Sequence, residues 1–95
     1  MRLIGIELLH TFKNQYPDAK APLEAWEREV EKAEWCTPHD VKEIYPQASL
    51  VGNNMVVFNI RGNKYRLLVI ISYQKGVVFV EKIGTHKEYD KWKLK

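Results

Sequence analysis

The sequence predicts an α+β domain with two layers, in which N-terminal helices pack on an antiparallel meander sheet and a short C-terminal helix follows. Two observations predict this fold class. Apolar residues recur at helical spacing before Pro46, whereas the chain after Pro46 is rich in Val, Ile, Phe and Tyr, which favour strands. Helices followed by a meander pack as two layers. Because 95 residues suit one core, we expect a single domain over residues 1–95.

Three helices are expected in the first half of the chain. Residues 6–16 place apolar side chains at helical spacing until a Tyr-Pro pair stops the helix. Residues 22–33 carry one apolar stripe, and the proline at their start suits a first helical turn. Residues 38–44 follow a threonine N-cap and place an acid in the first turn. Residues 2–5 form either a short edge strand or the lead-in to the first helix.

The second half predicts strands at residues 55–60, 65–73 and 77–83. Gly-Asn and Gln-Lys-Gly turns separate them, which indicates two consecutive hairpins. Residues 48–51 are a candidate for one more short strand. A Thr-x-x-Glu capping box at residues 85–88 predicts the start of the C-terminal helix. The helices need one face of this sheet to bury their apolar stripes, so the other face is left for function.

The net charge of +3 is unevenly distributed along the chain. Residues 1–51 hold six Lys or Arg against nine Asp or Glu, a balance of −3, and residues 52–95 hold nine against three, a balance of +6. This separation indicates that the C-terminal half contacts a polyanion. A solvated strand face with a basic tail is the alternative, and composition does not distinguish RNA, DNA or an acidic protein.

Several function classes are disfavoured by composition. The longest apolar run, residues 67–71, is far short of the roughly 18 residues of a membrane span. The first residues lack a long apolar core, so we expect no secretory signal, no membrane association and a cytoplasmic address. A lone Cys36 makes no internal disulfide, and neither His10 nor His39 has a second ligand at metal-binding spacing. We therefore expect no metal and no cofactor.

The first candidate site residue is Arg66, which lies inside a predicted strand. Strand parity places it on the same face as Lys64, with Tyr65 on the other face. An Arg among aliphatic neighbours must lie on an open face or be paired, and its planar fork suits bidentate contact with phosphate. The structural alternative is a cross-strand pair with Glu81 or another acid.

The start of the C-terminal helix supplies two more candidates. With Thr85 as N-cap, His86 takes the first helical position, where free backbone N–H groups favour an anion. Tyr89 lies three residues on, close to the same side of the helix. His acts as acid or base near neutral pH, and a Tyr phenol donates a proton or a hydrogen bond. The alternative is that both are ordinary surface and packing residues.

Four residues near the end of the chain have two interpretations each. Trp92 either packs on the protein or stacks on a base. Lys91, Lys93 and Lys95 either attract a nucleic-acid backbone or form a solvated tail.

Two blocks of sequence carry a family resemblance: Asn-Ile-Arg-Gly-Asn-Lys-Tyr-Arg at residues 59–66 and Gly-Thr-His-Lys-Glu-Tyr-Asp-Lys at residues 84–91. In this order and spacing they resemble the HigB branch of the RelE-type bacterial toxins, which are mRNA interferases. The resemblance implies a RelE-like fold with a concave basic face that receives mRNA, usually in the ribosomal A site. It also implies a partner, a HigA-like helix-turn-helix antitoxin.

The resemblance also implies roles for residues of this chain. Arg66 matches the family's strand Arg that contacts the scissile phosphate, and His86 and Tyr89 match its general acid and base, with their order open. Glu81 stands where relatives commonly carry a basic residue, and its neighbour Lys82 faces the opposite way in a regular strand. The expected RNA-binding residues are Lys64, Lys82, Lys87 and Lys91. The implied cleavage is metal-independent.

Three alternatives remain at this stage. One is a non-nucleolytic relative on the same fold, such as a ParE-like gyrase inhibitor, against which the His86 and Tyr89 pair argues. Another is an RNA-binding module with weakened or lost catalysis, to which Glu81 points. The third is a general interaction domain, which requires none of these motifs.

Overall fold

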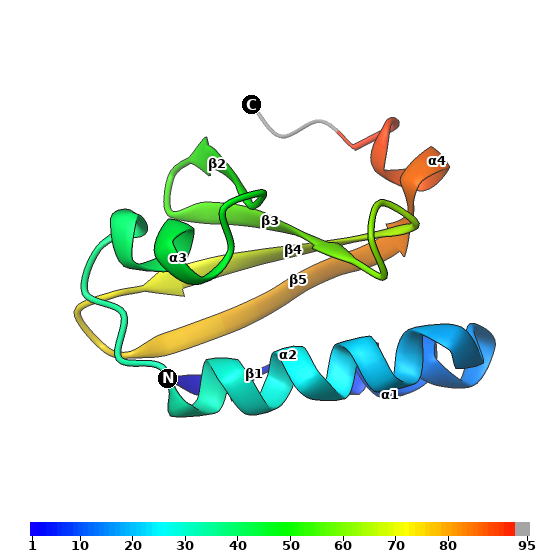
Figure 1. Cartoon of the computed structure of the whole chain (residues 1–95), viewed down its shortest axis with the longest axis horizontal. Helices are drawn as coiled ribbons and strands as arrows, with labels where there is room; N and C mark the ends of the chain where they lie inside the picture. The colour runs from blue at the N-terminus through cyan, green and yellow to red at the C-terminus, as the bar shows by residue number, and fades with distance from the viewer. Residues whose placement is uncertain (93–95) are drawn as a thin grey trace.

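The computed structural model describes residues 1–92, and within them it contains five strands, four α-helices and one 3-10 helix (Figure 1). The strands are β1 (Arg2–Ile4), β2 (Ser49–Gly52), β3 (Met55–Ile60), β4 (Tyr65–Ser72) and β5 (Val77–Thr85). The helices are α1 (Glu7–Gln15), α2 (Lys20–Lys32), α3 (Pro38–Ile44) and α4 (His86–Tyr89), with the 3-10 helix η1 (Pro17–Ala19) between α1 and α2. The α+β prediction is confirmed.

The strands form one sheet in the order β1-β5-β4-β3-β2. Strands β2 to β5 pair antiparallel as the predicted meander, but β1 pairs in parallel with β5. The sheet is therefore mixed: the predicted meander is antiparallel, and the candidate edge strand at residues 2–5 adds a parallel neighbour. Three residues are too few for periodicity to reveal a strand or its direction, and a parallel neighbour is reached only by a long connection, here α1 to β4.

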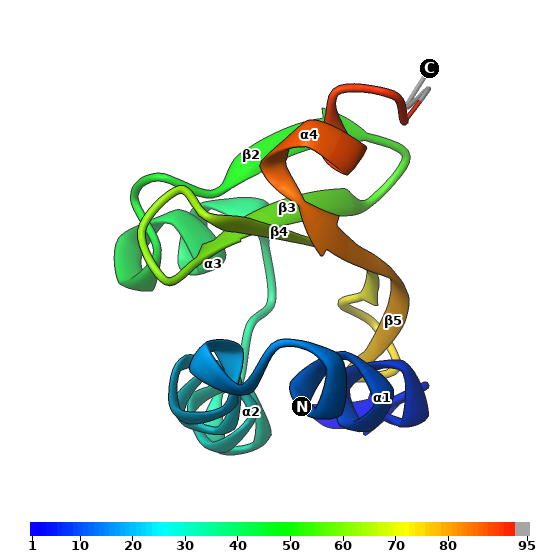
Figure 2. The same ribbon diagram turned by 90° about the vertical axis from the view of Figure 1, so that its right-hand side faces the viewer.

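The core lies between the sheet and helices α1 and α2, which cover one face (Figures 1 and 2). The buried helix residues are Leu9 and Phe12 on α1 and Leu23, Trp26 and Val30 on α2. They meet alternate residues of the strands, including Phe58, Leu67, Val69, Ile71 and Val78. In both views α4 lies beyond the sheet, away from α1 and α2. The helices thus occupy the face that their apolar stripes require.

Local signals account for most boundaries to within one residue, and two boundaries differ by two residues. Helix α2 begins at Lys20 instead of near Pro22, because η1 runs directly into it after the Tyr16-Pro17 stop. Strand β5 continues to Thr85, two residues past the expected end, because Ile83, Gly84 and Thr85 remain paired with β4. Within residues 1–92, no helix is both long and apolar enough to cross a bilayer.

Candidate active site

Arg66 lies on β4 and reaches the C-terminal helix. Its cross-strand partners are Asn59 on β3 and Gly84 on β5. The guanidinium carbon lies 5.3 Å from the centroid of the Tyr89 ring, within cation–π range, and Nη1 donates to the carbonyl of Asn63 at 3.1 Å. These two contacts hold the planar fork at the end of the sheet, beside the start of α4.

The alternative for Arg66, a cross-strand pair with Glu81, is wrong. The residue opposite Arg66 is Gly84, which has no side chain, and no carboxylate in the described part of the chain forms a salt bridge with the guanidinium. An Arg that is half-exposed and not neutralised by an acid remains available for an external anion.

Helix α4 begins with the predicted capping box. The Thr85 hydroxyl accepts from the Glu88 N–H at 3.1 Å, and the Thr85 N–H donates to Glu88 Oε1 at 2.8 Å. The His86 N–H donates to the carbonyl of Lys64 at 3.1 Å. The expectation of free N–H groups at this helix start is therefore wrong for His86 and Glu88, whose amides already have partners inside the fold.

The His86 side chain has a carboxylate neighbour that sequence reasoning missed. His86 Nδ1 lies 3.4 Å from Asp90 Oδ2, and the two side chains are 51% and 61% exposed. The His86 and Tyr89 rings lie edge to face with centroids 6.3 Å apart. The i, i+4 spacing of His86 and Asp90 on a predicted helix was a signal that could have found this contact. A carboxylate on Nδ1 orients the imidazole and leaves Nε2 free to exchange a proton.

A β-bulge changes the expected direction of Lys82. Leu68 on β4 pairs with Lys82, but the next residue, Val69, pairs with Val80, so Glu81 is the extra residue of β5. Lys82 is two positions from Gly84, the partner of Arg66, and therefore shares the face of Arg66. Lys82 would face the opposite way only in a regular strand, and the bulge shows that β5 is not regular at this point.

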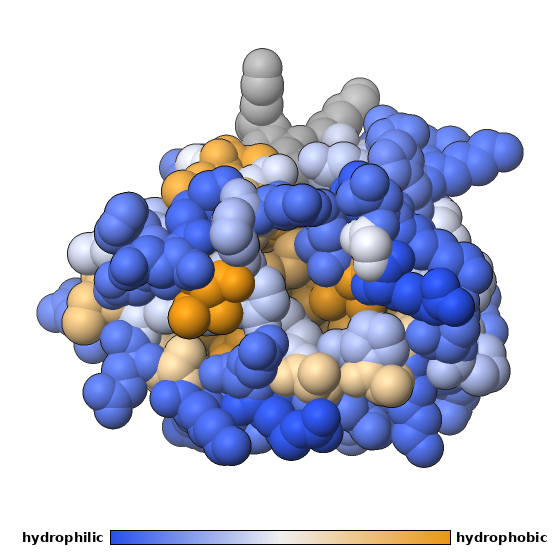
Figure 3. All heavy atoms as spheres, in the orientation of Figure 1, coloured by the Kyte–Doolittle hydropathy of each residue, from blue (hydrophilic) through white to orange (hydrophobic). Residues whose placement is uncertain are grey.

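An aromatic cluster follows Tyr89. The Tyr89 and Trp92 rings lie edge to face at 5.6 Å, and Lys82 Nζ lies 5.8 Å from the centroid of the Trp92 ring. A Cβ at Gly84 would come within 3.2 Å of Trp92 Cζ2. Trp92 therefore packs over the glycine opposite Arg66, with Lys82 on its ring and Tyr89 at its side. Figure 3 shows a predominantly hydrophilic surface around α4.

Two comparisons with known proteins bear on the family of this chain. A family model described as HigB toxin, RelE-like toxic component of a toxin-antitoxin system, matches residues 19–92. The chain belongs to the HigB toxin family. It is 27% identical over 92 residues to the mRNA interferase toxin HigB of Escherichia coli, an alignment that covers 95% of this chain and 88% of the relative. The mRNA interferase HigB of Shigella flexneri matches with the same identity and coverage.

The lysines predicted to bind RNA in this HigB family member are not all placed together. Lys64 Nζ forms a salt bridge with Asp18 at 2.6 Å, and the Tyr65 hydroxyl donates to the same carboxylate. Strand parity had placed Lys64 beside Arg66, but Lys64 precedes β4 and its flexible stem turns toward η1. Lys82, Lys87 and Lys91 are exposed, and Lys93 and Lys95 lie outside the described residues. The RNA contacts of these lysines stay a prediction.

Other features of this HigB family member lie away from the Arg66 cluster. His10 and His39 are exposed, and no group of three or more potential metal ligands occurs within residues 1–92. A groove of about 490 Å³ lies between α2 and α3, and its lining includes Glu34, Trp35 and Ile44. Figure 3 shows hydrophobic atoms gathered beside α3, at the left of the view. None of the predicted site residues lines this groove.

Proposed function

We propose that this HigB family toxin is an mRNA interferase, an endoribonuclease that cuts mRNA on the translating ribosome in the cytoplasm and so stops growth. One observation carries the proposal: Arg66, which forms no salt bridge with a carboxylate of residues 1–92, lies over the Tyr89 ring, and His86, with Asp90 Oδ2 at 3.4 Å from its Nδ1, lies edge to face with the same ring. The names of the relatives from Escherichia coli and Shigella flexneri support it.

The proposed reaction is transesterification within the RNA strand. A base removes the proton from a ribose 2′-OH, and the 2′-oxygen forms a bond to the adjacent phosphorus as the bond from phosphorus to the 5′-oxygen breaks. An acid gives a proton to that 5′-oxygen. The products are a 2′,3′-cyclic phosphate and a 5′-OH, and the electron pairs balance without a redox partner. The chemistry requires one cation at the phosphate and a pair of groups that exchange protons.

Residues of this chain fit these roles. Arg66 would bind the non-bridging oxygens and stabilise the negative charge that grows on them, a contribution of roughly 10²–10³-fold in other enzymes. His86 and Tyr89 would divide the proton removal and proton donation between them, a role worth about 10²–10⁴-fold. Because Asp90 is on Nδ1 of His86, proton exchange would occur at Nε2.

The surface beyond this cluster supports a path for an RNA strand. Lys82, on the face of Arg66, would bind a neighbouring phosphate, and Lys87 and Lys91 would attract the backbone. Trp92 offers an aromatic surface at the edge of the cluster. The charge balance of +6 over residues 52–95 supports a polyanionic ligand on this side of the molecule.

We further propose that the toxin is held inactive by a cognate antitoxin, a HigA-like helix-turn-helix protein encoded beside it. The family description, a toxic component of a toxin-antitoxin system, supports the existence of such a partner. Co-expression with the product of the neighbouring gene should restore growth to cells that produce the toxin.

The deciding experiment is inducible expression followed by primer extension on a cellular mRNA. We expect cuts within translated regions that disappear when translation of that message is blocked. Arg66→Ala should abolish the cuts and the growth arrest, whereas Arg28→Ala, an exposed Arg on α2, should preserve both. Growth arrest with intact transcripts would refute the proposal, and accompanying DNA-damage signalling would favour a gyrase inhibitor.

A further inference from the structure

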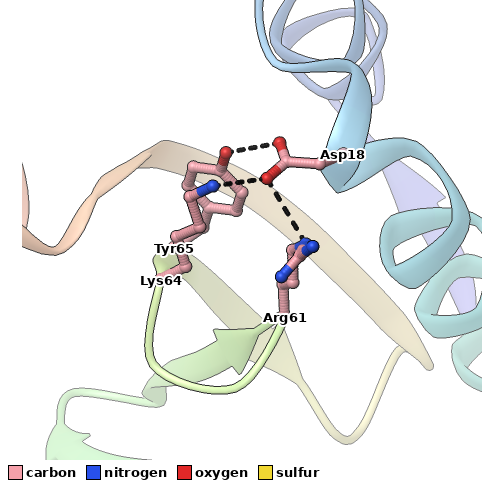
Figure 4. A network of polar contacts seen from close by, with 4 residues as sticks. All are labelled: Asp18, Arg61, Lys64 and Tyr65. Atoms are coloured by element: carbon pink, nitrogen blue, oxygen red, sulfur yellow. Dashed lines mark hydrogen bonds and ion pairs between the residues drawn. The ribbon is translucent and has the colours of Figure 1, made fainter.

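The turn between β3 and β4 is tied to the helical layer by one carboxylate. Asp18 on η1 accepts a hydrogen bond from Lys64 Nζ at 2.6 Å and from the Tyr65 hydroxyl at 2.5 Å, and it pairs with Arg61 Nε at 3.3 Å (Figure 4). Lys64 and Asp18 are 46 residues apart in sequence. This network, hereafter the Asp18 cluster, connects elements that share no local sequence signal.

The same turn provides backbone acceptors for the proposed catalytic residues. The carbonyl of Asn63 accepts from Arg66 Nη1 at 3.1 Å, and the carbonyl of Lys64 accepts from the His86 N–H at 3.1 Å. Residues 61–64 therefore have the Asp18 cluster on one side and two members of the candidate site on the other. A shift of this turn would move the guanidinium and the start of α4 together.

The turn needs tertiary contacts to hold its shape. Arg61 and Gly62 both have left-handed backbone conformations, with φ of 54° and 64°. Glycine adopts this conformation freely, but a Cβ, such as that of Arg61, disfavours it. The contact between Arg61 Nε and Asp18 favours this conformation, and the hydrogen bonds that Lys64 and Tyr65 donate to Asp18 fix the end of the turn.

We propose that Asp18 is a positioning residue of the toxin, which fixes the turn at residues 61–64 and through its carbonyls the geometry of Arg66 and His86. The inference rests on the proposed function for its catalytic consequence, but its structural part stands separately. Asp18 contacts none of the reacting groups. It also lies immediately before residues 19–92, the part matched by the HigB family model.

The charge state of the Asp18 cluster agrees with this role. The hydrogen bond from Lys64, followed by that from Tyr65, lowers the pKa of Asp18, and the same carboxylate raises the pKa of Lys64. Burial, followed by the bond to Asp18, raises the pKa of Tyr65. At neutral pH the carboxylate and the ammonium are thus charged while the phenol keeps its proton and donates it.

A matched pair of variants tests the proposal in the full chain. Asp18→Asn removes the charge from the Asp18 cluster. Glu27→Gln removes the charge from another Lys–carboxylate pair of equal length, 2.6 Å between Lys13 Nζ and Glu27 Oε2, which joins α1 to α2. Both substitutions raise the net charge by one, so an effect of net charge alone on RNA binding would be equal in the two.

Two readouts are needed, one of them independent of activity. Two-dimensional ¹⁵N–¹H spectra should show shifted amide signals for His86 and the turn residues in Asp18→Asn, and unchanged ones in Glu27→Gln. Cleavage of mRNA on programmed ribosomes should be roughly tenfold slower at saturation in Asp18→Asn, with no rise in the half-saturating concentration, because displaced catalytic groups lower the rate without removing binding contacts. Glu27→Gln should cleave like the wild type.

The outcomes separate the two proposals. If the wild-type toxin cuts no RNA but the His86 amide signal shifts only in Asp18→Asn, the proposed function fails and the positioning of the turn stands. If the wild type cuts RNA and Asp18→Asn matches its rate and spectrum, the positioning role is refuted. If Asp18→Asn does not fold, Tyr65→Phe removes only the hydroxyl donor to Asp18, and it should shift the same signals; an unchanged spectrum would overturn the proposal.

Discussion

The Tyr89 side chain combines two proposed roles, and its replacement by Phe separates them. The ring lies 5.3 Å from the Arg66 guanidinium carbon and 5.6 Å from the Trp92 ring, so it serves as a platform for both. The hydroxyl is the group proposed to donate or accept a proton. Tyr89→Phe keeps the platform and removes the hydroxyl, whereas Tyr89→Ala removes both.

The expected magnitudes of the two losses differ enough to be distinguished. A cation–π contact at an exposed site is worth about 0.5–1 kcal/mol. At roughly 1.4 kcal/mol per tenfold change in rate, loss of the platform alone would slow cleavage about two- to fivefold. Loss of a general acid or base costs about 10²–10⁴-fold. Tyr89→Phe should therefore be at least about 100-fold slower than wild type, with Tyr89→Ala only about two- to fivefold slower again.

The assay is single-turnover cleavage of mRNA on programmed ribosomes, with thermal unfolding measured in parallel. Tyr73→Phe, which follows the far end of β4 from α4, controls for the loss of a tyrosine hydroxyl elsewhere in the sheet. Its rate should equal that of the wild type. A Tyr89→Phe rate within fivefold of wild type would show that the hydroxyl is not required and would remove Tyr89 from the acid–base pair.

Three further changes test the surrounding geometry. Gly84→Ala places a Cβ 2.9 Å from the capping carboxylate and 3.2 Å from a Trp92 ring carbon, so urea unfolding should show a loss of roughly 1–3 kcal/mol; unchanged stability would contradict this packing. Asp90→Asn should slow cleavage about 1.4- to fivefold, because the contact with His86 is exposed and such pairs are worth about 0.2–1 kcal/mol; a rate equal to wild type would mean that Asp90 does not orient the ring. The pKa of Asp18 is lowered in the fold, so its contribution to stability is complete above its unfolded pKa and is lost as the pH falls below about 4. Between pH 6 and 3, the free energy of unfolding should therefore fall less in Asp18→Asn than in wild type, as measured by chemical unfolding.

Local signals in the sequence were sufficient for the elements that build the site. The capping box at residues 85–88 forms as its spacing requires, and β3 occupies residues 55–60 as predicted. Both depend on interactions within a few residues: a side chain that bonds a nearby backbone amide, or alternation of apolar residues along a strand. The start of α4, and with it the placement of Tyr89, was predictable from the sequence for that reason.

The parts that could not be predicted depend on register or on distant contacts. The bulge at Glu81 reverses the face of Lys82, and strand parity gives no sign of an extra residue until the pairing partner is known. The capture of Lys64 by Asp18 joins residues from different layers, so no periodicity indicates it. These two effects explain why two of the four predicted RNA-binding lysines have surroundings other than those expected, while Lys87 and Lys91 remain exposed.

Gly84, which has no side chain, lies where the fold and the candidate site meet. Gly84 stands opposite Arg66, and a Cβ there would press on Glu88 and Trp92. Because Gly84 has no Cβ, the Glu88 carboxylate and the Trp92 indole can pack directly over β5. Helix α4 then begins close to the strand, and Tyr89 lies against Arg66. A Cβ at this position would require the Glu88 and Trp92 side chains to shift. The geometry of the site therefore depends on the strand's pairing register as much as on the reactive side chains, since only the observed register sets a glycine against the arginine.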